Sequence, residues 1–292
     1  MKFFLDWIKG SNRNRMLFFA SIVCAMIFFN LVSHYINVQR EESLKKAESA
    51  KIDSHIEVKG QSIYIGGEEV YRFLPVSGGT LSVYDSTEQR RRDITVRSFM
   101  LGEIPVSTRL QEYLFHGTVV SDTCAEFYFD FPANNGTFAN WNKFLEILNQ
   151  KTGHKFRLPT NDEWEYAARG GMSSQNYKYA GGNKIEEVAV YRDNCKGLGS
   201  FMCRDKRPNE LGFYDMSGCI WEITSTNIQD FFKEYKTYNR IFSKGENNGI
   251  AEFSESHIAR GGSYDSSAEE CELNYIPHKS IMLTGARLVM DY

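Results

Sequence analysis

The sequence has 292 residues, of which 42% are hydrophobic and 14% aromatic, and its formal net charge is −3. This length and aromatic content are enough for one sizeable hydrophobic core. The charge is nearly balanced, and the dense basic run Arg90-Arg91-Arg92 is followed directly by Asp93. The sequence therefore does not support nucleic-acid binding.

The N-terminal part predicts a membrane anchor. Residues 16–36 contain no Asp, Glu, Lys or Arg, and as a helix they are long enough to cross about 30 Å of hydrocarbon. Residues 1–15 carry four basic residues against one acidic residue, which predicts a cytoplasmic N-terminus and a periplasmic or extracellular C-terminal part. A cleaved signal peptide is the alternative. It fits less well, because the apolar run is long and no A-x-A-like site follows it.

Residues 37–59 predict a polar helical stalk. They contain five basic and five acidic residues, and Glu41/Lys45 and Glu42/Lys46 have the i,i+4 spacing of an exposed helix. The segment has no sustained apolar a/d seam, which favours a spacer over a coiled coil. Residues 60–292 are then expected to form a single domain.

The first part of this domain predicts strands and one amphipathic helix. Alternating apolar runs at 62–66, 70–76 and 93–103 predict strands. Between 139 and 150, apolar residues recur at i, i+3, i+4 and i+7, namely at Trp141, Phe144, Leu145 and Leu148. That spacing predicts a helix with one face on the core.

A second helix is predicted to start at Thr160. Its side chain can accept the Glu163 amide while the Glu163 carboxylate reaches back to the Thr160 amide, and Gly170 and Gly171 end the helix. The sequence after it is rich in Gly, Asn, Ser and Tyr. The domain is therefore expected to be a mixed, loop-rich body of helices and strands.

The sequence lacks several common catalytic signatures. It has no G-x-S-x-G, no G-x-x-x-x-G-K-[ST] and no H-E-x-x-H motif. Asp215 and Glu222 bracket a Gly-containing loop, and two carboxylates with intervening carbonyls suit calcium. By themselves, two solvated acids beside a tight turn are the simpler interpretation.

Five cysteines follow the predicted anchor, and in an oxidising compartment they could pair. They are Cys124, Cys195, Cys203, Cys219 and Cys271. Because five is odd, at least one stays unpaired or pairs with another chain. Cys195 and Cys203 are close in sequence and are candidates for a short disulfide.

Six blocks in one order resemble the formylglycine-generating enzyme, or sulfatase-modifying factor, family, and together they span nearly the whole predicted domain. The blocks are VSGGT (76–80), FRLPTNDEWEYAARGG (156–171), YAGGN (179–183), RPNELGFYDMSGCIWEI (207–223), ARGGSYDSSAEEC (259–271) and GARLVM (285–290). The resemblance implies an α+β fold, a loop-rich variant of the C-type lectin fold with little regular secondary structure.

The resemblance also implies a calcium site in the GFYDMSGCIWE loop. Asp215 and Glu222 would supply side-chain oxygens, and Gly218 and Ile220 would supply backbone carbonyls. One residue departs from the family pattern, because Cys219 stands where members usually have Asn.

Catalytic members oxidise a cysteine of a client sulfatase to formylglycine with a cysteine pair that holds copper(I). Here Cys271 occupies the second position of the pair, but Ser266 occupies the first. A hydroxyl is a hard, poor donor for copper(I), so copper is not expected. Cys271 has a structural interpretation as well, in which it pairs with Cys219.

Two functions follow from these residues. The preferred hypothesis is a non-catalytic binding or structural module of the cell envelope that takes a protein or glycan ligand. The alternative is an oxidoreductase that converts a client cysteine to formylglycine, or a related oxygen-dependent enzyme, using Cys271 alone. The first is preferred because loss of one thiolate removes the chemistry and leaves the fold intact.

Overall fold

A computed structural model describes residues 55–85, 89–116, 131–196, 202–232, 257–277 and 284–291. The chain divides into two compact units, Met1–Ile52 and Asp53–Tyr292, and all described residues belong to the second. Among these residues, no helix is long and apolar enough to cross a membrane. The predicted cytoplasmic segment 1–15, the anchor 16–36 and most of the stalk lie outside the described part of the chain.

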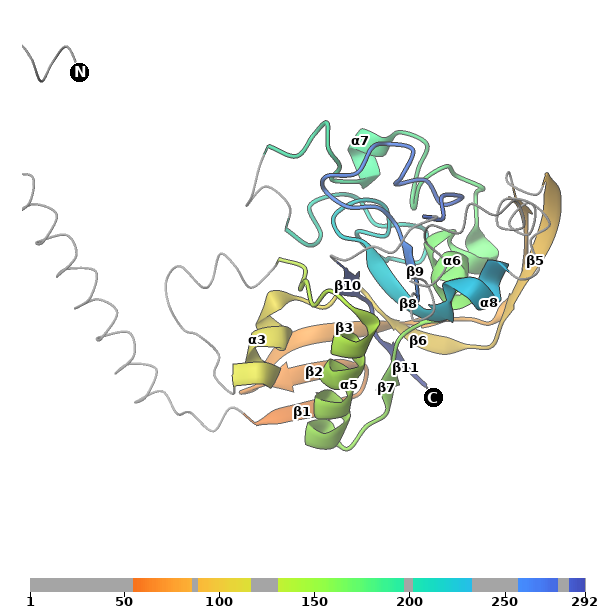
Figure 1. The fold of residues 1–292 in the computed structure, drawn as a ribbon. Coiled ribbons are helices and arrows are strands. Elements are labelled where there is room, and N and C mark those ends of the chain that lie inside the picture. Colours follow the sequence, from red (N-terminus) through yellow and green to blue (C-terminus); the bar gives the residue numbers. More distant parts are fainter. Residues whose placement is uncertain are drawn as a thin grey trace, which may run out of the picture. The chain divides into compact units, whose positions relative to one another are not determined.

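The larger sheet has six strands in the order β1-β2-β3-β6-β11-β7, and all neighbours in it are antiparallel. Its strands are β1 (Ile56–Lys59), β2 (Ser62–Ile65), β3 (Glu68–Val76), β6 (Phe99–Gly102), β7 (Phe156–Arg157) and β11 (Val289–Met290). The late strand β11 lies between β6 and β7, so distant parts of the chain close this sheet (Figure 1). Strand β1 belongs to residues predicted as stalk. The domain therefore begins before Gly60.

The strand predicted over 93–103 is two strands. Strand β5 (Arg90–Val96) pairs with β4 (Gly79–Asp85) in a separate two-stranded ribbon, whereas β6 joins the larger sheet. The chain changes sheets at Arg97 and Ser98, where the backbone passes very close to Gly78. A Cβ atom at Gly78 would lie 2.7 Å from the Arg97 carbonyl carbon. This close approach explains a glycine in the VSGGT block.

Two helices cover part of the larger sheet. Helices α3 (Thr108–His116) and α5 (Phe138–Thr152) contact each other, and α5 also contacts β1 and β7 (Figure 1). All four apolar residues predicted for the inner face of α5 are buried. Helix α6 (Asn161–Ala168) begins with the predicted capping box between Thr160 and Glu163.

The rest of the described chain is mostly loop around a second, smaller sheet. This sheet has the order β10-β8-β9, with β8 (Glu222–Asn227), β9 (His257–Arg260) and β10 (Gly285–Ala286). Short helices η1 (Gly171–Ser173), α7 (Ile185–Val188) and α8 (Ile228–Phe232) lie in the connections. The predicted α+β, loop-rich organisation is confirmed.

Candidate functional site

A buried ion pair joins Glu222, the last residue of GFYDMSGCIWE, to Arg287. Glu222 opens β8, and Arg287 follows β10, whose Gly285 is paired with Glu222. The Arg287 guanidinium donates to both Glu222 oxygens, at 2.7 Å and 3.0 Å, and the Trp164 indole donates to Glu222 Oε2 at 2.7 Å. Both charged side chains are essentially inaccessible to solvent. The Glu222 carboxylate thus accepts three N–H hydrogen bonds.

Asp215 is also buried, and besides this burial the Glu222 charge is close enough to raise its pKa. Asp215 Oδ2 accepts the backbone N–H of Arg204 at 2.8 Å, and burial raises the pKa of this carboxyl to about 6. Among the described residues, no group of three or more His, Cys, Asp or Glu side chains could hold a metal ion. The guanidinium of Arg287 neutralises Glu222 instead.

Of the predicted calcium set of Asp215, Gly218, Ile220 and Glu222, Glu222 is the member that these contacts make a poor ligand. The acids of a calcium site must direct free carboxylate oxygens at one point, whereas Glu222 is committed to Arg287 and Trp164. The sequence identified Glu222 as a candidate ligand but did not reveal Arg287 as its partner. An acidic residue inside the apolar block IWEIT was the available signal, because a buried carboxylate requires a cation.

Ser266 and Cys271, the positions of the cysteine pair in catalytic relatives, are both buried here. Ser266 Oγ accepts the Ser263 backbone N–H at 3.0 Å and lies 3.2 Å from Ser263 Oγ. Cys271 has no exposed surface, and burial raises the pKa of its thiol to about 12. A Cβ atom at Gly262 would lie 2.7 Å from Cys271 Sγ, so the thiol is packed against backbone.

This donor set does not fit copper(I). One partner is a hydroxyl already hydrogen-bonded to its own loop, and the other is a protonated thiol inside an apolar cluster with Tyr179, Val188 and Tyr191. Copper(I) requires soft thiolate donors. Cys271 is thus a packed core thiol and not half of a Cys219–Cys271 disulfide.

Cys203, Cys219 and Cys271 carry free thiols. Neither the Cys195–Cys203 nor the Cys219–Cys271 disulfide considered from sequence is formed. Cys271 packs in the cluster around Tyr179, whereas Cys219 packs with Phe131 and Val190. The pKa of the Cys219 thiol is raised well above its usual value, first by a hydrogen bond with Cys203 and then by burial.

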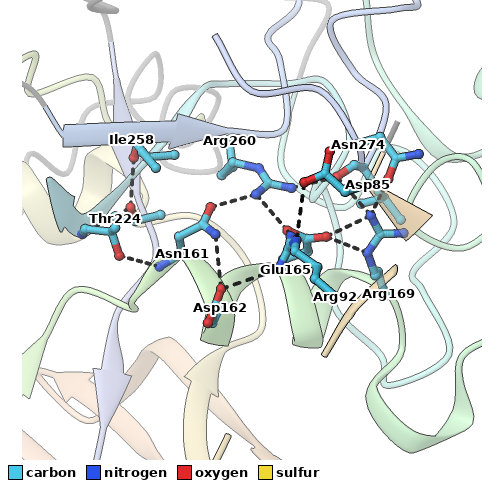
Figure 2. A network of polar contacts seen from close by, with 12 residues as sticks. Asp85, Arg92, Asn161, Asp162, Glu165, Arg169, Thr224, Ile258, Arg260 and Asn274 are labelled. Atoms are coloured by element: carbon cyan, nitrogen blue, oxygen red, sulfur yellow. Dashed lines mark hydrogen bonds and ion pairs between the residues drawn. The ribbon is translucent and has the colours of Figure 1, made fainter. Parts of the chain in front are cut away.

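A second buried charge network surrounds Glu165 of α6 (Figure 2). Arg260 of β9 donates to Glu165 Oε2 at 3.0 Å, and Arg169 donates to Oε1 at 2.8 Å. Arg92 of β5 also donates to Oε2. Arg260 in turn donates to Asn161 Oδ1 at 2.6 Å. The network ties α6 to β5 and β9, so Glu165 has a structural role.

A cleft of about 670 Å³ lies near the start of α6, away from Ser266 and Cys271. It is lined by residues 95–99, 160–163, Arg157, Thr226, Phe231 and Asp291. Arg157 is held by Glu163 and Asp291, with N–O distances of 2.7 Å to each, whereas the Arg97 side chain is exposed. Basic and acidic side chains both line the cleft, whereas Ser266 and Cys271 are not among its lining residues.

Comparison with known families agrees with this organisation. The sulfatase-modifying factor enzyme 1-like domain, named FGE-sulfatase, matches residues 42–291. The chain belongs to this family. The match covers both the buried Glu222–Arg287 pair and the Ser266–Cys271 segment, and it begins ahead of β1.

Curated relatives in the sulfatase-modifying factor family differ in their named activities. The chaperone protein LppX of Paenibacillus barcinonensis is 32% identical over 141 residues, which are 41% of this chain and 42% of that protein. The inactive C-alpha-formylglycine-generating enzyme 2 of Bos taurus is 36% identical over 90 residues, 25% of this chain and 27% of that protein. The chain thus matches less than half the length of either relative.

A solved structure shows the same fold. The variable protein 1 of Treponema denticola superposes with a TM-score of 0.59 at 21% identity, over 78% of this chain and 97% of that chain. At this identity the likeness concerns the fold alone, and it agrees with the α+β architecture of the family.

Proposed function

We propose that this chain is a non-catalytic member of the sulfatase-modifying factor family, a binding or structural module of the cell envelope. The observation that carries the proposal is the state of Cys271, which is fully buried and protonated and has the Ser266 hydroxyl at the partner position. The chemistry of the catalytic members needs two thiolates, so this segment retains the fold and not the reaction. Relatives named as a chaperone and as an inactive enzyme support the same conclusion.

Recognition would use loops held on a rigid body, as in the C-type-lectin-like fold that the family implies. The cleft beside α6 provides charged groups and hydroxyls, including Arg97, Ser98 and Thr160, for a protein or glycan ligand. A ligand in this cleft would not contact Cys271. The proposed binding site is therefore separate from the Ser266–Cys271 segment.

The purified chain is expected to leave a peptide containing C-x-P-x-R unchanged in the presence of copper(I) and oxygen. The reason is that neither a second thiolate nor an accessible first one is available at Ser266 and Cys271. Mass spectrometry of the peptide detects the aldehyde that a formylglycine generator would produce, and a catalytic family member provides the positive control. An aldehyde product that disappears in Cys271→Ala would establish the oxidoreductase function instead.

We further propose that residues 16–36 anchor the chain as a single helix with the N-terminus in the cytoplasm and the domain outside. The uninterrupted apolar run and the basic residues before it support this topology. The full chain is expected to stay in the membrane pellet after carbonate washing, and protease added to spheroplasts, which lack the outer envelope, should degrade the domain. A chain released into the carbonate supernatant would contradict the anchor, and protection of the domain from protease in spheroplasts would contradict the orientation.

A further inference from the structure

The cleft beside α6 contains a cationic side chain that is still available to a ligand. Arg97 lines the cleft and is exposed. Its guanidinium makes no hydrogen bond or ion pair in the part of the chain that the structure describes. Arginine carries several N–H donors in a planar arrangement that matches a carboxylate. Arg97 can therefore donate to a bound molecule without first breaking a contact within the described domain.

Three hydroxyl groups of the cleft are also available as donors. Each of them accepts a backbone N–H, at 2.9 to 3.1 Å, so part of its acceptor capacity is already used. A hydroxyl also has one donor hydrogen, and none of the three donates it to a described residue. These hydroxyls belong to Ser98, Thr160 and Thr226. The open hydrogen-bonding groups of the cleft are thus mainly donors, which suits a ligand that supplies acceptor oxygens.

The acidic side chains of the cleft are more fully used. Arg157 donates to both carboxylate oxygens of Glu163 and also to both oxygens of Asp291. This group of three carries one net negative charge, and the half-exposed Asp162 adds another. These charges would repel a ligand with several acidic groups, whereas a single carboxylate can pair with Arg97.

We propose that the cleft binds a peptide segment of a partner protein through one acidic side chain, whose carboxylate pairs with Arg97. The inference rests on the proposed binding function and names the class of ligand for the same cleft. The hydroxyls of Ser98, Thr160 and Thr226 would donate to the main-chain carbonyls of the peptide. A guanidinium–carboxylate pair of this kind fixes the orientation of the bound segment as well as its charge.

An acidic glycan is the other source of a carboxylate, and the aromatic residues of the cleft do not favour it. Sugar rings commonly stack on open aromatic faces. The aromatic residues that line the cleft are Phe99 and Phe231. Phe99 is 1% exposed, and Phe231 packs against Ile228 and Ile258. The described lining therefore offers a sugar ring no open aromatic platform.

Selection from a random heptapeptide library on the full chain in a nonionic detergent tests the inference. The enriched peptides are expected to share one Asp or Glu. Replacing that residue with Asn or Gln should weaken binding about tenfold, because it removes a charged partner from the hydrogen bonds of Arg97. Dissociation constants are measured by fluorescence anisotropy at low ionic strength, where charge attraction is screened least.

Three variants of the chain locate the contact. Arg97→Gln should weaken the enriched peptides by the same factor of about ten. Arg91→Gln is the matched control, because Arg91 is exposed on β5 but does not line the cleft. Asp162→Asn should strengthen binding by about twofold, since it removes a neighbouring like charge. An unchanged melting temperature of Arg97→Gln would show that the variant remains folded.

Equal effects of Arg97→Gln and Arg91→Gln, or enriched peptides without an acidic residue, would overturn the inference and leave the binding function in place. A library that yields no binder would also overturn it. Galacturonate oligomers are then tested on the same chains. Binding that Arg97→Gln weakens would assign the carboxylate to a sugar, and no binding would remove the cleft as a binding site. The aldehyde assay decides the non-catalytic assignment independently of all these results.

Discussion

Replacing Arg287 with methionine is expected to lower the free energy of unfolding by about 3–5 kcal/mol, because it leaves the Glu222 carboxylate buried without its cation. Burial alone would lower the pKa of Arg287, but the charge and hydrogen bonds of Glu222 raise it, so the guanidinium stays charged. Arg287 also donates to the carbonyls of Gly102 and Tyr214, at 2.9 Å and 2.7 Å. The variant therefore loses the link between β10, β6 and the loop before β8.

Chemical denaturation of the parent and of Arg287→Met measures this loss. Arg207→Met is a matched control, because Arg207 pairs with Glu187 at 2.7 Å but both side chains are largely exposed. A surface pair of this kind contributes about 0–1 kcal/mol. A double variant, Glu222→Leu with Arg287→Met, is expected to recover part of the loss, since it removes both charges. Equal effects of Arg287→Met and Arg207→Met would contradict the structural role of the pair.

Stability is expected to fall steeply between about pH 4.5 and pH 2, and Glu165 is a major cause. Burial alone would raise the pKa of Glu165, but the charges of Arg260, Arg169 and Arg92 outweigh burial and lower it to about 2. A carboxyl with a lowered pKa in the folded state contributes stability above its unfolded pKa. That contribution is lost as the pH falls through the folded value. For Glu165 it corresponds to about 3 kcal/mol.

Glu165→Gln tests this contribution. At pH 7 the variant is expected to lose about 3 kcal/mol or more of unfolding free energy, because the three guanidinium groups around Glu165 lose their shared carboxylate. Between about pH 4.5 and pH 2 its stability should then change less than that of the parent. Glu146→Gln, at an exposed position of α5, is the control and should keep the parent's pH dependence. Parallel pH curves for the parent and Glu165→Gln would contradict the assignment.

Local patterns predicted local structure well. The capping box at Thr160 and the buried face of α5 depend on residues within a few positions of each other, and both were found as expected. The change of sheet between β5 and β6 was missed, because it depends on the close passage of Gly78 past Arg97, 19 residues later in the sequence. Apolar alternation alone cannot report such an approach.

The charged sites were harder to predict because their members are far apart in the chain. Glu222 and Arg287 are 65 residues apart, and Glu165 and Arg260 are 95 residues apart. The sequence indicated Glu222 as a ligand, but it could not show that Arg287 donates to both of its carboxylate oxygens. The sequence alone shows that Ser266 stands at the first position of the cysteine pair, because this depends on the residue type at one position.

The position of β11 has a consequence for synthesis of the protein. Until residues 289–290 leave the ribosome, β6 has an unpaired edge and β7 has no neighbour in the described sheet. Open edges of this kind can pair with other nascent chains. Arg287 is made 65 residues after Glu222, so Glu222 lacks its counter-charge while those residues are synthesised. A chain that ends before Arg287 would therefore lack the strand that joins β6 to β7, and its buried Glu222 would have no counter-charge.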